Sequence, residues 1–399
     1  MRRILVPFVC FVCTLAGLAS PAAVPGFATT VPSDGAEVSL MTDSQKEFVL
    51  MPMAVRRERF ADAEYRRRLA EGKWFQRPVR LVWTWNGPES EGGPLFSVEV
   101  TRAKDGLPVA LLSAATTNAV VDNLEIATEY TWRVTPVLMG RKLDVQALGR
   151  FKTAGYAPRT LRIDGVANSR DLGGRVGLGG RRVRQGLVFR TAGLNANATP
   201  VNPAGKKKTA DGKDVVSKER KKGKVLITET GKRYMLDVLG IRTDIDLRSS
   251  GETFGMTGSP LGDGCRWVRH SSCCYGNMDS EKGRKAFAAV FRLFLDRRNY
   301  PILFHCIGGK DRTGSLAFIL NGLLGVSENE LYLDWEATGF WNRRTDFVHK
   351  GLLDNLVKCF DKYEGGTIND RICAYVKSTG FTDADIEVFR VIMLESEGY

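Results

Sequence analysis

Two hydrophobic patterns meet near residue 158 and divide the chain. Between Pro78 and Ala154 apolar and polar residues alternate, most clearly in "RLVWTW", "FSVEVT" and "YTWRVTP", with turn signals such as "NGPESEGG" between them. Strands of this length with one buried face are typical of an antiparallel sandwich, so we predict an all-β sandwich domain over residues 78–156. The buried faces that the pattern predicts are Leu81, Trp83 and Trp85; Phe96, Val98 and Val100; and Tyr130, Trp132 and Val134.

After Pro158 short apolar strands alternate with segments of helical periodicity. The strands are Thr243 to Leu247 and "PILFHC", and the helical segments include "YMLDVLG", "AFAAVFRLFLDRR" and "GSLAFILNGLL". This alternation predicts an α/β domain over residues 157–399, with a mostly parallel sheet flanked by helices. Residues 195–224, rich in Lys, Gly, Pro and Asn, interrupt the pattern and predict a basic loop insertion.

The N-terminus has the pattern of a secretory signal peptide. Two arginines precede the apolar run Ile4–Ala19, and small residues follow it. We expect cleavage before Ala23, which removes residues 1–22. The mature protein is then expected to be secreted or periplasmic. The alternative is an uncleaved membrane anchor, although the run is slightly shorter than the ~17 to 25 residues of a spanning helix.

For residues 23–77 the pattern predicts an N-terminal segment that contains one charged helix. Val55–Gly72 ("VRRERFADAEYRRRLAEG") places Phe60, Tyr65 and Leu69 near one face. A basic run of this kind is most often a solvated face. It lacks the interleaved aromatic residues and the motifs of nucleic-acid binding, so we expect no nucleic-acid partner.

Composition limits the classes of partner and cofactor that the sequence predicts. The formal net charge of +13 favours anionic partners such as phosphate esters. The eight cysteines include no zinc-type pair of CxxC motifs, and there are only three histidines, so we expect neither a metal site nor another cofactor. Disulfide pairing and oligomeric state stay open.

The stretch with most chemistry is "LFHCIGGKDRTGS", residues 303–315. We expect a buried strand to end at His305, a sharp loop to run from Cys306 to Arg312, and a helix to begin near Thr313. Loop amides and a helix N-terminus together form an anion site, and the same field favours the thiolate form of Cys306. The planar fork of Arg312 matches two phosphate oxygens. A nucleophile and an anion site therefore meet at one place.

These residues carry a resemblance to a known family. "HCIGGKDRTG" resembles the signature of the protein tyrosine and dual-specificity phosphatase superfamily, in its branch of bacterial tyrosine-phosphatase-like proteins. "VANSRDLGG" (Val166–Gly174) and "IDLRSSGE" (Ile245–Glu252) resemble two further motifs of that branch. Separately, "NLEIATEYTWRV" resembles the end of a fibronectin type III domain.

The resemblance implies a two-step mechanism through a phosphocysteine on Cys306, with Arg312 stabilising the phosphoryl oxygens. In the family's pattern His305 holds the loop and Thr313 hydrogen-bonds the thiolate. Substrate-binding candidates are His305, Ile307, Gly308, Gly309, Lys310, Thr313 and Asp246. Gly308 and Gly309 let the backbone approach the anion closely.

The general acid has three candidates. Many superfamily members carry an Asp on a mobile loop before the cysteine, which corresponds to Asp279. In the branch resembled here Asp311 has been regarded as a possible acid, and Asp246 stands at a strand end. For Asp246 and Asp171 a structural hydrogen-bonding role is favoured over catalysis.

The sequence therefore predicts a phosphatase acting on phosphotyrosine or with dual specificity. Phosphoinositides and inositol phosphates are the alternative substrates, because the charge of Lys310 suits a substrate with more than one phosphate. Two hypotheses of another class remain: a protein that binds phosphorylated ligands without turnover, and a binding protein whose sandwich domain meets a surface partner.

Overall fold

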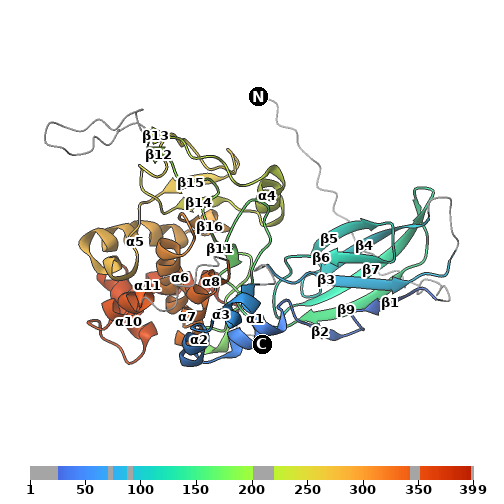
Figure 1. Cartoon of the computed structure of the whole chain (residues 1–399), viewed down its shortest axis with the longest axis horizontal. Helices are drawn as coiled ribbons and strands as arrows, with labels where there is room; N and C mark the ends of the chain where they lie inside the picture. Colours follow the sequence, from blue (N-terminus) through green and yellow to red (C-terminus); the bar gives the residue numbers. More distant parts are fainter. Residues whose placement is uncertain (1–25, 71–74, 88–92, 201–219, 342–350, 397–399) are drawn as a thin grey trace. The chain divides into compact units, whose positions relative to one another are not determined.

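The computed structural model describes residues 26–70, 75–87, 93–200, 220–341 and 351–396 (Figure 1). The predicted signal peptide lies outside these residues. The described residues form two compact units: the first lies within the ranges Met1–Ala36, Arg80–Ala119 and Tyr130–Phe151, and the second within Glu37–Val79, Val120–Glu129 and Lys152–Tyr399. No helix in the described ranges is long and apolar enough to cross a membrane.

Strands make up most of the first unit. One sheet has the order β1-β3-β6, and the other has the order β2-β9-β7-β4-β5 with β8 paired to β7. Strands β4 and β7 are antiparallel and place Val98 opposite Val134 and Val100 opposite Trp132. The predicted apolar faces are buried, apart from the half-buried Trp85. The strands are β1 Ala28–Val31, β2 Ala36–Val38, β3 Val79–Thr84, β4 Leu95–Arg102, β5 Pro108–Ala114, β6 Asn118–Val121, β7 Glu129–Leu138, β8 Arg141–Lys142 and β9 Ala147–Thr153.

The second unit is built on a five-stranded sheet of order β10-β11-β16-β14-β15. Strand β16 lies in the middle and pairs in parallel with β11 and β14; β14 pairs in parallel with β15, and only the edge strand β10 is antiparallel. The mostly parallel sheet predicted from sequence is confirmed. Its strands are β10 Arg170–Asp171, β11 Val188–Thr191, β14 Thr243–Asp246, β15 Arg266–Arg269 and β16 Ile302–His305.

Helices follow the strands of this sheet (Figure 1). The α-helices of the C-terminal half are α4 Glu229–Arg233, α5 Glu281–Phe294, α6 Asp311–Leu323, α7 Glu328–Glu336, α8 Thr338–Trp341, α9 Leu352–Phe360, α10 Ile368–Ser378 and α11 Asp383–Met393. Shorter helical turns are η1 Leu178–Gly180, the π-helical turn η2 Tyr234–Val238, η3 Tyr275–Asp279 and η4 Arg297–Asn299.

Both faces of the central strand are buried, which explains its unbroken apolar sequence. Ile302 and Phe304 point into the larger core cluster, which holds the buried faces of α5, α6, α10 and α11. Leu303 points the other way, into a smaller cluster with Phe189 and Met235. Successive side chains of a strand alternate between faces, so a strand covered on both sides must be apolar throughout.

The predicted basic insertion is described only at its base. There β12 (Thr199–Pro200) pairs antiparallel with β13 (Arg220–Lys221). Residues 201–219 of the insertion lie outside the described part of the chain.

The prediction of one charged helix over Val55–Gly72 is wrong. In the described part of this range the chain forms α2 (Met53–Arg59) and α3 (Ala63–Ala70) as separate short helices, and a further short helix, α1 (Asp43–Leu50), precedes them. Asp62 accepts a hydrogen bond from the backbone N–H of Glu64 at 2.8 Å, as N-terminal capping residues do, so a new helix starts where the pattern predicted continuity.

The three N-terminal helices belong to the same compact unit as the α/β sheet. Phe60, Tyr65 and Leu69 share one predicted face, and all three are buried. They pack with Leu333 and Ala337 from the C-terminal half. The apolar face that the pattern predicted therefore packs against the region of α7, while Arg59, Arg67 and Arg68 are exposed.

Arg56 joins these helices to α7 through a buried ion pair. Its Nε lies 2.6 Å from Glu336 Oε2, and the two side chains are 0% and 2% exposed. Arg56→Met should lower the free energy of unfolding by about 3 to 5 kcal/mol, because Glu336 would be buried without its partner. Urea denaturation measures this loss.

The neighbouring Arg57 provides the control for this prediction. Its pair with Asp354, at 2.7 Å, is 36% exposed on both sides. Arg57→Met should cost less than about 1 kcal/mol. Equal losses in the two variants would contradict a special role for the buried pair.

Candidate active site

Cys306 follows β16 directly, and α6 begins at Asp311, so a short loop joins the central strand to a helix. The helix is buried from Thr313 to Leu323, which fixes the position of its N-terminus. Cys306 itself is 2% exposed. The predicted strand, loop and helix are therefore present in the predicted order, with the helix starting two residues before Thr313.

Three consecutive carbonyl groups of the loop accept hydrogen bonds from outside it. Gly193 N donates to Ile307 O at 2.9 Å, Asn168 Nδ2 to Gly308 O at 2.8 Å, and Arg190 Nη2 to Gly309 O. In a trans peptide the C=O and N–H groups point in opposite directions. The N–H groups of residues 308, 309 and 310 therefore face the interior of the loop, where an anion would bind.

Two glycines allow this close packing. Gly309 has a φ of +67°, and a Cβ at this residue would lie 2.5 Å from the carbonyl oxygen of Thr191. A Cβ at Gly314 would lie 2.7 Å from Cδ1 of Trp335. Larger residues would force the loop and the first turn of α6 away from their supports.

Behind the loop, Asp334 binds a group of buried arginines. Arg190 Nη1 contacts Asp334 Oδ2, Arg175 Nη2 lies 2.9 Å from Oδ1, and Arg170 Nε lies 3.6 Å from Oδ1. All four side chains are 2% exposed or less. Burial would raise the pKa of Asp334, but the three guanidinium groups hold it far below its usual range. Arg190 thus links Asp334 directly to the backbone of the loop.

His305 supports the loop from the strand side. Its Nε2 lies 3.0 Å from Asp244 Oδ1, and its Nδ1 lies 3.2 Å from the carbonyl oxygen of Cys306. Burial lowers the pKa of His305, but the carboxylates of Asp244 and Asp246 outweigh it and raise the pKa to about 9. A charged imidazole carries a proton on Nδ1, so it donates to the Cys306 carbonyl while Nε2 forms an ion pair with Asp244.

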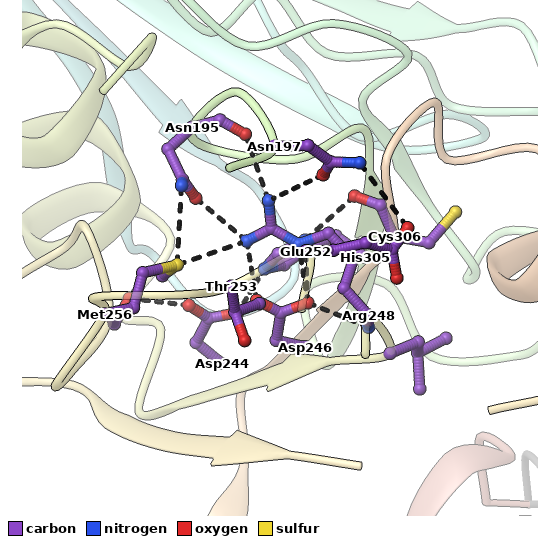
Figure 2. Close-up of polar contacts among 12 residues, drawn as sticks. Asn195, Asn197, Asp244, Asp246, Arg248, Glu252, Thr253, Met256, His305 and Cys306 are labelled. Carbon is purple, nitrogen blue, oxygen red and sulfur yellow. Dashed lines mark hydrogen bonds and ion pairs between the residues drawn. The ribbon is translucent and has the colours of Figure 1, made fainter. Parts of the chain in front are cut away.

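The carboxylate of Asp246 is paired with the guanidinium of Arg248. Figure 2 shows the Arg248 guanidinium among Asp246, Asn195 and Asn197; its Nε and Nη2 lie 2.9 and 2.6 Å from the two oxygens of Asp246. Although burial alone would raise it, His305 and Arg248 lower the pKa of Asp246. The carboxylate is fully buried. These contacts support a structural role for Asp246 and do not place it against a substrate.

Glu252 orients Arg312. Nη1 and Nη2 of Arg312 lie 2.8 and 2.9 Å from the two carboxylate oxygens of Glu252. The hydrogen bonds from Arg312 lower the pKa of Glu252 to about 2 despite its partial burial. Ser249 N fixes the carboxylate in turn at 2.7 Å. This bidentate pair sets the plane of the guanidinium.

The two remaining acid candidates lie in different surroundings. Asp311 stands in the first turn of α6, and its Oδ1 accepts a hydrogen bond from the hydroxyl of Tyr275. Asp279 is bound by Lys362 Nζ at 2.6 Å and by Tyr363 Oη at 2.7 Å. The structure thus brings Asp311 beside Arg312 in the loop and helix start, whereas the contacts described for Asp279 are with other segments.

Further predicted residues differ in exposure. Ile307 is 48% exposed at the loop, and Lys310 Nζ lies 5.0 Å from the centre of the Trp335 ring. Thr313 is fully buried, and within the described structure its Oγ1 makes no hydrogen bond, so the expected bond to Cys306 is not present. Asp171 is fully buried and pairs with Arg159 at 2.8 Å, consistent with the structural role favoured from sequence.

The cysteines of the described chain are all free thiols: Cys265, Cys273, Cys274, Cys306, Cys359 and Cys373. Burial, and after it the charge of Asp311, raises the pKa of the Cys274 thiol to about 11.

Sequence reasoning missed the residues that support the loop from behind: Asn168, Arg190, Tyr275, Asp334 and Trp335. One signal was available, because Arg190 is the single charge in the apolar segment "LVFRTAGL", and Asp334, with Glu336, lies inside the largely apolar segment "LYLDWEA". A charge in a segment that must be buried needs a partner of opposite charge. The pairing itself joins residues far apart in sequence and is visible only in the fold.

Comparison with known proteins finds a family whose model matches part of this unit. Residues 204–395 match the tyrosine phosphatase family. The match covers slightly less than half of the chain and describes similarity over this region alone.

Individual relatives are more distant. A protein of Cupriavidus necator named "Putative tyrosine-protein phosphatase" is 30% identical over 200 residues, which are 44% of this chain and 61% of that protein. Two solved structures, the Siw14 catalytic core and the core catalytic domain of PP-IP phosphatase SIW14 from S. cerevisiae with citrate, are each 16% identical over 31% of this chain. They are covered over 74% and 75% of their lengths, with TM-scores of 0.24 and 0.23. Such low scores define neither a shared fold nor a substrate.

The charge on His305 makes stability depend on pH. Its folded-state pKa of about 9 lies above the ordinary value of 6.5, so this contribution is complete below pH 6.5 and is lost as pH rises through about 9. The free energy of unfolding should fall by on the order of 3 kcal/mol across that window. Urea denaturation at a series of pH values measures the change, and His305→Asn should flatten it. The same slope in both proteins would contradict a charged His305.

Proposed function

We propose that the second unit is a cysteine-dependent phosphatase that hydrolyses phosphate monoesters through a phosphocysteine intermediate. One observation carries the proposal: Cys306 begins a loop whose carbonyl groups are held from outside, and Arg312 closes that loop with its fork fixed by Glu252. Inward amides beside a nucleophile and a bidentate cation form a site for a phosphoryl group.

The first step transfers the phosphoryl group to sulfur. The thiolate of Cys306 attacks phosphorus, an S–P bond forms, and the P–O bond to the leaving group breaks while an acid protonates the leaving oxygen. Negative charge on the three phosphoryl oxygens meets the loop amides and the guanidinium of Arg312. These groups are in place before the reaction, so they need no rearrangement during it.

The second step returns the enzyme to its starting state. Water attacks phosphorus and gives its proton to the carboxylate that acted as the acid. The S–P bond breaks, which releases inorganic phosphate and restores the thiolate of Cys306.

Asp311 is the acid that the geometry supports best. It precedes Arg312 at the start of α6, next to the loop that would bind the phosphoryl group. Asp279 is held by Lys362 and Tyr363 and lies 3.9 Å from Arg284, so its carboxylate is engaged by two cations. Asp246 is fully buried against Arg248.

For the substrate we propose phosphotyrosine, with broader dual specificity included. The family match and the half-exposed Ile307 beside the nucleophile support an aromatic leaving group. Lys310, held over the Trp335 ring, favours a second candidate class with several phosphates, the phosphoinositides and inositol phosphates.

The remaining parts of the chain complete the proposal. The leader pattern of residues 1–22 supports a secreted or periplasmic location. The alternating strands of the first unit support a fibronectin type III-like sandwich that meets a surface partner or serves as a spacer.

Replacing the nucleophile tests the mechanism. Cys306→Ser should lower kcat for p-nitrophenyl phosphate by about 10³-fold or more, because a serine hydroxyl is not ionised in this site. Arg312→Lys should lower it by about 10²-fold, since a point charge cannot replace the fork. Circular dichroism checks that each variant is folded.

Arg298→Lys is the matched control for the arginine. Arg298 also pairs with a carboxylate, Asp296, but its side chain is 90% exposed, so activity should not change. Full activity in Cys306→Ser, or loss of wild-type activity on metal chelation, would rule out the cysteine mechanism.

A substrate panel tests the specificity. We expect kcat/KM to be higher for phosphotyrosine peptides than for phosphoinositides and inositol polyphosphates. The reverse order would favour the second candidate class, and Lys310→Met should then impair hydrolysis of the polyphosphorylated substrates selectively.

A further inference from the structure

Tyr275 is linked to Asp311 directly through its hydroxyl and indirectly through Ser315. Its phenolic O–H donates to Asp311 Oδ1. Its backbone N–H donates to Ser315 Oγ at 2.9 Å, and the hydroxyl of Ser315 donates to the carbonyl oxygen of Asp311, also at 2.9 Å. The side chain and the backbone of one tyrosine therefore both position one aspartate.

Tyr275 is itself fixed by Trp335. The indole Nε1–H donates to the tyrosine oxygen at 3.3 Å, and the two rings meet edge to face with centroids 6.3 Å apart. Tyr275 also has a φ of +53°, which is uncommon for a residue with a side chain and persists only where surrounding contacts hold it. These contacts make the hydroxyl a rigid donor.

The tyrosine keeps its proton over the working range of pH. Burial, and after it the hydrogen bond to the Asp311 carboxylate, raises the pKa of Tyr275 far above its ordinary value. The hydroxyl therefore remains a donor to Asp311 while the carboxyl group gains and loses a proton during turnover.

We propose that Tyr275 is a positioning residue for proton transfer by Asp311. This inference rests on the proposed phosphatase function. The bond from Tyr275 holds Oδ1 and so presents Oδ2 to the leaving oxygen. Without that bond the carboxyl group samples other rotamers, and protonation of the leaving group becomes less frequent, because terminal torsions of aspartate are broad.

The defect should depend on the leaving group. An aryl phosphate with a basic leaving group, such as phenyl phosphate, needs the proton, whereas 2,4-dinitrophenolate leaves as a stable anion. Tyr275→Phe should lower kcat for phenyl phosphate by about tenfold, the rate equivalent of one hydrogen bond to a charged group. The loss for 2,4-dinitrophenyl phosphate should be under about twofold. Purely structural damage would lower both rates alike.

The chain offers a matched control. Tyr363 donates from its hydroxyl to Asp279 Oδ1 at 2.7 Å, so Tyr363→Phe removes the same kind of bond from the other acid candidate. It should leave the dependence on the leaving group unchanged. A defect confined to basic leaving groups in Tyr363→Phe would overturn the proposal and point to Asp279.

Equal losses for both substrates in Tyr275→Phe, or no loss, would also overturn it. Should that variant fail to fold, Trp335→Phe gives a second test, because it keeps the tyrosine hydroxyl but removes the donor that fixes it. The same preference for activated substrates is expected there, and its absence would contradict the proposal. Failure of the phosphatase function would look different: wild type would hydrolyse neither substrate, or Cys306→Ser would retain activity.

Discussion

The buried carboxylate of Asp334 is the interaction on which the loop depends. Three guanidinium groups surround it, and one of them, Arg190, also donates to the carbonyl of Gly309. A buried charge without its partner costs several kcal/mol. If one of these side chains moved away, it would leave another buried charge unpaired, so the cluster holds all of them in place. Through Arg190, an ion cluster outside the loop therefore fixes the peptide group that follows Gly309, beside the peptide groups held by Gly193 and Asn168.

Three consecutive residues at the end of α7 contact three different parts of the structure. Asp334 binds the arginines behind the loop, Trp335 contacts Tyr275 and Lys310, and Glu336 binds Arg56 of the N-terminal helices. Consecutive helical side chains point in directions about 100° apart, so three neighbours reach three different partners. The N-terminal helices thus stabilise the same element that orients the loop and the candidate acid.

Sequence predicted the features that local pattern determines. The strand "ILF", the loop from Cys306 and the helix after it follow from apolar runs and glycine, and the structure has all of them. It could not predict that the helix pattern of Val55–Gly72 would break at Asp62, because a capping aspartate and a surface aspartate look alike in sequence. Nor could it rank Asp279 against Asp311, since their tyrosine partners come from separate segments.

The ion cluster also has an electrostatic consequence for the site. Three arginines outnumber the acidic groups near them, Asp334 and the more distant Glu330, which lies 3.6 Å from Arg175. Burial, and after it the charge of Arg190, lowers the pKa of Arg170 to about 9. Because charges interact more strongly in a medium of low polarity than in water, this excess adds to the field of the loop amides. Arg190, which contacts the loop at Gly309, brings part of that field to the place where a thiolate and a phosphoryl group would carry negative charge.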